Sequence, residues 1–165
     1  MRRWFVGLFS VMVVAGALVA PRAAASDTPI GHLGDTLRVN DLQGRIVADV
    51  TVANVLPADI PPGWGYPPRW PRQEVWRAQI TVTAVNVPSA SAMATRFAFR
   101  GVTQTGDSYI ARNNDAPDTL QTALLRAPQG STVSGGIWWD VYRDLVSNVV
   151  LTDVATGYRL AQWNL

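Results

Sequence analysis

The chain has 165 residues with one histidine, no cysteine and no lysine, and its 14 arginines against 12 acidic residues give a formal charge of +2. The missing cysteines exclude disulfide bonds, thiolate zinc sites, iron–sulfur clusters and cysteine nucleophiles. A single histidine leaves almost no room for a histidine-based metal site, and the length favours one domain.

The beginning of the chain has the three regions of a secretory signal peptide. Two arginines form a positive head, residues 5–20 form an apolar run, and residues 23–25 are small alanines that offer a cleavage site before Ser26. The apolar run is shorter than the roughly 20 residues that a membrane-spanning helix needs. The sequence therefore predicts a secreted, extracellular protein from which residues 1–25 are removed, by general export in preference to the twin-arginine route, with no membrane span left after cleavage.

Removal of the signal peptide changes the charge balance, because it removes three arginines and no acid and leaves 11 arginines against 12 acids. No basic excess then remains to attract phosphate groups, so we expect no nucleic-acid binding. The remaining 140 residues contain no repeat and no linker. They predict a single domain, 26–165, which is large enough to bury a core without disulfide bonds.

Alternation of apolar and polar residues dominates from residue 26 onward and indicates strands. Strands are predicted over 33–39, 45–53, 74–87, 95–102, 109–112, 132–142, 148–152 and 158–163. The patch 119–126 is compatible with either one helical turn or another edge strand. Short strands with frequent Gly, Pro and Asp turns predict an all-β sandwich or barrel.

Period two divides the run 132–142 into two faces. The predicted core face holds Ile137, Trp139 and Val141, and the opposite face holds Trp138, Asp140 and Tyr142. A tryptophan and a tyrosine that face away from the core need a cover or a partner.

The segment 57–72 contains six of the eleven prolines and carries Trp64, Tyr66 and Trp70. Proline removes backbone donors and fixes φ, so this segment is predicted to be a stiff extended loop. Two interpretations are open: the tryptophans pack down as a lid, or the loop presents aromatic side chains to a partner. We favour the lid for at least one tryptophan and exposure for Tyr66.

Catalytic and metal-binding patterns are weak. His32 has no nucleophile motif near it and is expected at the surface or at a strand edge. Glu74 and Asp140 are the carboxylate pair that a glycosidase would need, although any β domain scatters acids in this way. The oxygen-rich run 113–118, with Asn113, Asp115 and Asp118, contains calcium-type ligands but reads better as a turn. We therefore predict no catalytic residues, no cofactor and no metal.

Seven segments in order resemble the small secreted immunogenic antigens of mycobacteria, the MPT/MPB "sixty-three" type. They are 30–37 (IGHLGDTL), Asp41 with 44–47 (GRIV), 76–84 (WRAQITVTA), 116–120 (APDTL), 128–130 (PQG), 137–141 (IWWDV) and 160–163 (LAQW). The resemblance covers essentially the whole mature chain. It implies an exported, immunoglobulin-like antiparallel β-sandwich of about seven to nine strands, without an established enzymatic activity or cofactor.

The leading functional hypothesis is a secreted, non-enzymatic binding module with a protein partner at the host or bacterial cell surface. The alternatives are a structural protein of the cell envelope without a discrete ligand site and, less favoured, a small-ligand carrier or an unrecognised hydrolase. The sequence leaves the oligomeric state open. The candidate interaction surface consists of Trp64, Tyr66, Trp70, Trp138 and Tyr142.

Overall fold

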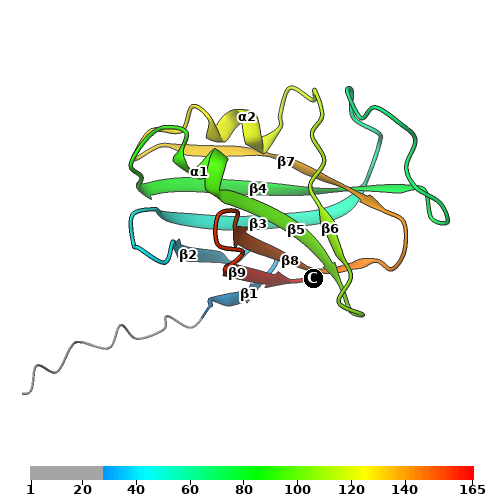
Figure 1. The fold of residues 1–165 in the computed structure, drawn as a ribbon, viewed down its shortest axis with the longest axis horizontal. Helices are drawn as coiled ribbons and strands as arrows, with labels where there is room; N and C mark the ends of the chain where they lie inside the picture. The colour runs from blue at the N-terminus through cyan, green and yellow to red at the C-terminus, as the bar shows by residue number, and fades with distance from the viewer. Residues whose placement is uncertain (1–27) are drawn as a thin grey trace, which may run out of the picture.

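The computed structural model describes residues 28–165, so the signal peptide predicted over 1–25 lies outside the described residues. Strands dominate this part of the chain (Figure 1). They are β1 (Ile30–His32), β2 (Thr36–Asn40), β3 (Val47–Ala58), β4 (Glu74–Asn86), β5 (Phe97–Thr103), β6 (Ser108–Ile110), β7 (Thr132–Val141), β8 (Val146–Asp153) and β9 (Arg159–Asn164). Two short helices, α1 (Ala92–Arg96) and α2 (Leu120–Leu124), complete it. Neither is long and apolar enough to cross a membrane.

The strands form two sheets that face each other as a sandwich. One sheet has the order β1-β9-β8-β5-β6 and the other has the order β2-β3-β4-β7. Pairs within 28–165 are antiparallel apart from β1 and β9, which run parallel with Ile30 opposite Gln162. The predicted all-β sandwich of seven to nine strands is confirmed, with this parallel pair as a local departure.

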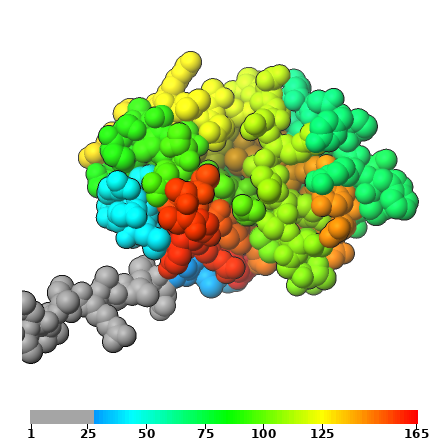
Figure 2. Space-filling view, viewed as in Figure 1, coloured from blue at the N-terminus to red at the C-terminus, as the bar shows by residue number. Residues whose placement is uncertain are grey.

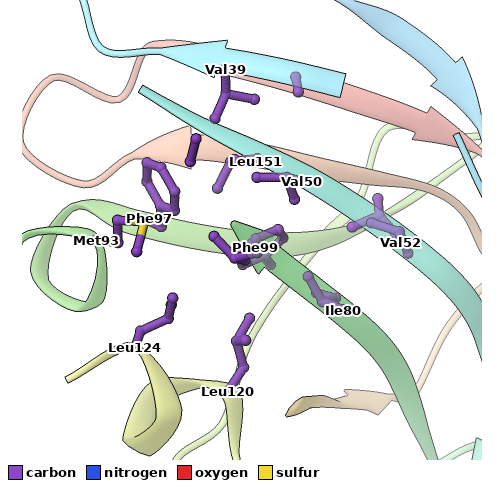
Figure 3. Packing of buried hydrophobic residues seen from close by; sticks show 14 of the residues in the cluster. Val39, Val50, Val52, Ile80, Met93, Phe97, Phe99, Leu120, Leu124 and Leu151 are labelled. Carbon is purple, nitrogen blue, oxygen red and sulfur yellow. The ribbon is translucent and has the colours of Figure 1, made fainter. Parts of the chain in front are cut away.

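The core between the sheets follows the predicted alternation. Ile80 and Val82 on β4 are fully buried, as are their cross-strand neighbours Val50 and Val52 on β3. The side chains that meet in Figure 3 are Val39, Val50, Val52, Ile80, Phe97, Phe99 and Leu151 from strands, and Met93, Leu120 and Leu124 from the two helices. The inward faces predicted for 74–87 and 95–102 are therefore confirmed.

The first predicted strand, 33–39, begins too early, and the short strand before it is missed. Residues 33–35 connect β1, which pairs with β9, to β2, which begins at Thr36 and pairs with β3 in the other sheet. The change of sheet occurs at Gly34, whose φ is 91°, a conformation that glycine adopts without steric penalty. One turn residue therefore sends the chain from one layer of the sandwich to the other.

The helices and the end of β3 also depart from the prediction. Helix α1 is not predicted, because five residues are too few to establish a helical period, whereas α2 falls inside the ambiguous patch 119–126. Strand β3 continues to Ala58, two residues into the segment predicted as loop. Pro57 is tolerated there because β2 pairs only with 47–51, which leaves β3 as an edge at this point.

An ion pair joins α1 to the end of β8. Arg96 donates from Nε to Asp153 Oδ1 at 3.0 Å and from Nη2 to Oδ2, and the Ala155 backbone N–H donates to Oδ1 at 2.8 Å. Asp153 is fully buried. The hydrogen bonds from Arg96 outweigh burial and lower the pKa of Asp153 below its ordinary value.

We expect this pair to make stability sensitive to acid. Because the folded-state pKa of Asp153 lies below the unfolded value of about 4, its contribution is complete above that value and is lost as pH falls through the lower folded pKa. The melting temperature of Asp153→Asn should be lower than that of the wild-type protein at pH 7, and the difference should narrow below about pH 4. Thermal melts across this range check it, and a constant difference would contradict it.

Candidate functional site

The loop between β3 and β4 projects at one end of the long axis, drawn in teal and green in Figure 1 and visible as a protruding lobe in Figure 2. Its three aromatic side chains differ in burial. Trp64 is only 4% exposed, whereas Tyr66 is 63% exposed and Trp70 is 78% exposed. The lid interpretation is confirmed for Trp64, and the expected exposure of Tyr66 is confirmed as well.

Trp64 belongs to a small second core on the outer side of β4 and β7. Its buried members are Trp64, Val75, Ala116 and Trp138. Trp138 lies on the face opposite Trp139, as predicted, and is 5% exposed because this cluster covers it. The cover that an outward tryptophan requires is therefore supplied by the loop.

Tyr142 is half-buried, and Arg69 of the loop, which also pairs with Asp140, stacks on its ring. Strand β7 ends at Val141, so the alternation that places Trp138 and Asp140 on the outer face does not reach Tyr142. Its ring packs against the edge of Tyr109, with centroids 5.6 Å apart, beside the main core. The five predicted surface residues therefore divide into two buried, two exposed and one half-buried side chain.

Asp140 anchors the loop from beneath. Its side chain is buried, and it accepts hydrogen bonds from Arg69 Nε at 2.8 Å and from the Arg69 backbone N–H at 3.0 Å. Arg112 Nη1 lies 3.6 Å from Asp140 Oδ2, and Arg112 Nη2 donates to the carbonyl of Trp64 at 3.0 Å. One carboxylate therefore holds the loop and the segment that follows β6 together.

Guanidinium groups stack on the aromatic rings of this end. Arg112 Cζ lies 4.5 Å from the ring centre of Trp64 and 4.1 Å from that of Tyr66, and Arg69 Cζ lies 3.7 Å from that of Tyr142. Such cation–π contacts stabilise a preferred ring orientation. We did not predict these arginine contacts, because the stacked pairs are separated by dozens of residues and nothing in the sequence marks Asp140, at an outward-facing position, as buried.

Two glycines allow the close packing. Gly63 has a φ of 75°, and a Cβ at this position would lie 2.9 Å from the backbone nitrogen of Asp115, which donates to the carbonyl of Pro62 at 2.8 Å. A Cβ at Gly136 would lie 2.5 Å from the Trp138 ring. Larger residues at either position would separate the loop from the sheet.

The carboxylates that a hydrolase would use are engaged in structural contacts. Asp140 lies beneath the loop with its two arginines. Glu74 accepts from Trp76 Nε1 at 2.9 Å and from Arg72 at 3.1 Å, and these hydrogen bonds, led by that of Trp76, lower its pKa. A general acid in a glycosidase requires a raised pKa, whereas the pKa of Glu74 is lowered.

The other sequence candidates are also accounted for. His32 lies on edge strand β1 with an exposed side chain, as predicted. In the run 113–118, Asn114 Oδ1 accepts from the Ala116 N–H at 3.0 Å, which is a turn contact, and Asp118 pairs with Arg77. Within residues 28–165, no group of three His, Cys, Asp or Glu side chains is arranged to hold a metal.

Comparisons with known proteins agree with this fold. A family model described as a domain of unknown function, DUF1942, matches residues 28–159. The chain belongs to this family. The structure is similar to that of MPT63, a secreted protein from Mycobacterium tuberculosis, with 28% identity and a TM-score of 0.67 over 85% of this chain and all of MPT63. The resemblance proposed from the sequence motifs is confirmed.

Other comparisons add little to the DUF1942 assignment. A lipoprotein candidate from Staphylococcus aureus is 7% identical, with a TM-score of 0.44 over 79% of this chain and 92% of its own, and it supports no argument. A search of curated proteins finds no significant match. The likeness to MPT63 confirms the predicted secretion and, at a coarse level, supports a non-enzymatic protein.

Proposed function

We propose that this DUF1942 protein is a secreted, non-enzymatic binding module that engages a protein at the cell or host surface through Tyr66 and Trp70. The observation that carries the proposal is the exposure of these two aromatic side chains, 63% and 78%, on one loop. Tryptophan and tyrosine are enriched among the residues that dominate binding energies at protein interfaces.

Rigidity of the loop supports the same proposal. Its base is held by buried Trp64, by Asp140 and by the close approach at Gly63, so the exposed rings are mounted on a fixed support. A surface that is ordered before binding loses less conformational entropy when a partner docks. Arg112 further restricts Tyr66 by stacking on one face of its ring.

The absence of lysine provides a direct way to test the loop. The chain has a single primary amine, at its N-terminus, and β1, with which the described strands begin, lies on the side of the molecule away from the 57–72 loop (Figure 1). Labelling this amine with a fluorophore leaves the loop unmodified. Flow cytometry then measures binding of the labelled protein to intact bacterial and mammalian cells.

We expect saturable binding that weakens at least about tenfold in Tyr66→Ala and Trp70→Ala, since central aromatic side chains contribute about 2 kcal/mol or more. Leu42→Ala, at an exposed apolar residue between β2 and β3, is the matched control and should bind as the wild-type protein does. Equal binding by all variants, or no saturable binding, would contradict the proposal and favour a structural role in the envelope.

A further inference from the structure

A pocket of about 240 Å³ lies beside the outer edge of β7, and neither Tyr66 nor Trp70 lines it. It is enclosed by the segment that follows β6, by the start of α2 and by residues 136–138 of β7. Figure 1 shows α2 and the segment that follows β6 next to each other along β7. Polar side chains from 112–114 and 119–122 line most of this pocket.

Three of these polar side chains are exposed and have hydrogen-bonding groups that the fold does not use. Gln121 donates from Nε2 to the carbonyl of Ala94 at 2.8 Å, which leaves its Oε1 as an acceptor. Thr122 Oγ1 accepts from the Thr119 hydroxyl at 2.8 Å, which leaves its own O–H as a donor. The third, Asn113, has an amide that bonds to no residue in 28–165. A ligand in the pocket can therefore reach both donors and acceptors without breaking a contact of the fold.

The pocket offers no free charge. Among the described residues that line it, only Arg112 is charged. Its guanidinium is already engaged, because Nη2 donates to the carbonyl of Trp64 at 3.0 Å and Nη1 lies 3.6 Å from Asp140 Oδ2. An anionic ligand would have to compete with a buried carboxylate for this arginine, so the pocket favours a neutral molecule.

Apolar groups on one side of the pocket restrict the ligand further. Ala111 and Ile137 line it and are partly exposed. The Trp138 ring is covered, because Trp64 packs against it and the Arg77 guanidinium lies 5.0 Å from its centre. An aromatic ligand therefore has no open ring on which to stack, whereas the C–H groups of a saturated ring can pack on Ala111 and Ile137.

We propose that this pocket binds one neutral sugar ring. A sugar hydroxyl both donates and accepts, so a ring with several hydroxyls can accept from Thr122, donate to Gln121 and do both with the Asn113 amide. The volume corresponds to about eight water molecules at about 30 Å³ each, which is room for a single ring. The proposal does not depend on a protein partner at Tyr66 and Trp70.

The test is an amide chemical-shift titration of the ¹⁵N-labelled secreted protein with the methyl glycosides of glucose, galactose and mannose. At least one should shift the amides of Asn113, Gln121, Thr122 and Ile137 in a saturable way at millimolar concentration. Methyl glucuronide, which adds a carboxylate, should bind no more tightly than methyl glucoside, because Arg112 is already paired. N-Acetylglycinamide, a neutral peptide unit without a saturated ring, should bind at least about tenfold more weakly than the best glycoside.

Variants separate binding from folding. Asn113→Ala changes an exposed side chain, so it should fold normally, and the loss of its amide should weaken binding of the best glycoside about tenfold. Asn40→Ala is the matched control, because Asn40 is an exposed asparagine on β2, at the opposite edge of the same sheet from β7, and should bind as the wild-type protein does.

Four results would overturn the proposal. The first is the absence of any saturable shift of these amides with the three glycosides. The second and third are binding of N-acetylglycinamide as tight as that of the best glycoside, which would indicate a peptide site, and tighter binding of the glucuronide than of the glucoside, which would indicate an anion site. The fourth is unchanged binding in Asn113→Ala.

Discussion

Replacing Trp64 with alanine is expected to lower the free energy of unfolding by about 3–5 kcal/mol, the range for large-to-small changes at buried aromatic residues. Trp64 packs with Val75, Ala116 and Trp138, and Arg112 stacks on its ring. Truncation would leave a cavity in this cluster, because its other three buried members cannot fill the volume of the indole ring. It would also expose Trp138 to water. Urea unfolding followed by circular dichroism measures the change.

Two further variants define the cause of this loss. Trp70→Ala removes an equally large but exposed ring, so its free energy of unfolding should stay within about 0.5 kcal/mol of wild type. Trp64→Phe should recover much of the stability, because the Trp64 indole N–H has no hydrogen-bond partner within residues 28–165 to lose. If Trp64→Ala lowered the free energy of unfolding as little as Trp70→Ala does, Trp64 would not act as a lid on Trp138.

Asp140→Asn is expected to lower the free energy of unfolding by about 1.5–3 kcal/mol, the usual contribution of hydrogen bonds to a buried charged group, because the carboxylate is buried while Arg69 keeps half of its side chain in water. The substitution removes the negative charge between Arg69 and Arg112, and an asparagine amide cannot replace both charged contacts. The backbone bond from Arg69 to Oδ1 also orders the loop, so its amides should exchange faster. Urea unfolding and hydrogen exchange test the two effects.

Asp118→Asn is the matched control for this change. Asp118 also pairs with an arginine, Arg77, but its side chain is 54% exposed, and exposed pairs contribute about 0–1 kcal/mol. A similar small effect in Asp140→Asn would mean that the buried pair does not anchor the loop. The exposed aromatic surface would then lack the fixed support on which its proposed role depends.

Local chemistry in the sequence determined the strands and their faces. In 76–84 the side chains alternate strictly between apolar and polar, and period two leaves one choice of buried face once a sheet has a core on one side. The prolines of 57–72 likewise identify a loop, because a residue without an N–H cannot continue a paired strand. The signal-peptide pattern predicted secretion, and the family motifs favoured a sandwich over a barrel; the comparison with MPT63 confirms both.

The sequence identified the aromatic residues of the candidate site but not which of them are buried. Composition identifies Trp64, Tyr66 and Trp70 as one aromatic group, yet the structure buries the first and exposes the other two. The loop has no period that assigns a face, so burial depends on which ring meets Trp138, a residue more than 70 positions away in the chain. The sequence likewise does not show that β7 ends at Val141, one residue before Tyr142.

Tertiary structure alone decided the contacts between distant charges. Arg112 reaches Trp64 and Asp140, and Asp41 faces Arg45 and Arg96, through approaches of strands and turns that no local pattern encodes. A guanidinium or carboxylate at an outward position looks like ordinary solvated surface in the sequence. Its role depends on what the fold brings within about 4 Å, because charge interactions weaken with distance and with exposure to water. The sequence therefore determines which residues form strands and loops, whereas the packing of those elements decides which charges and rings form sites.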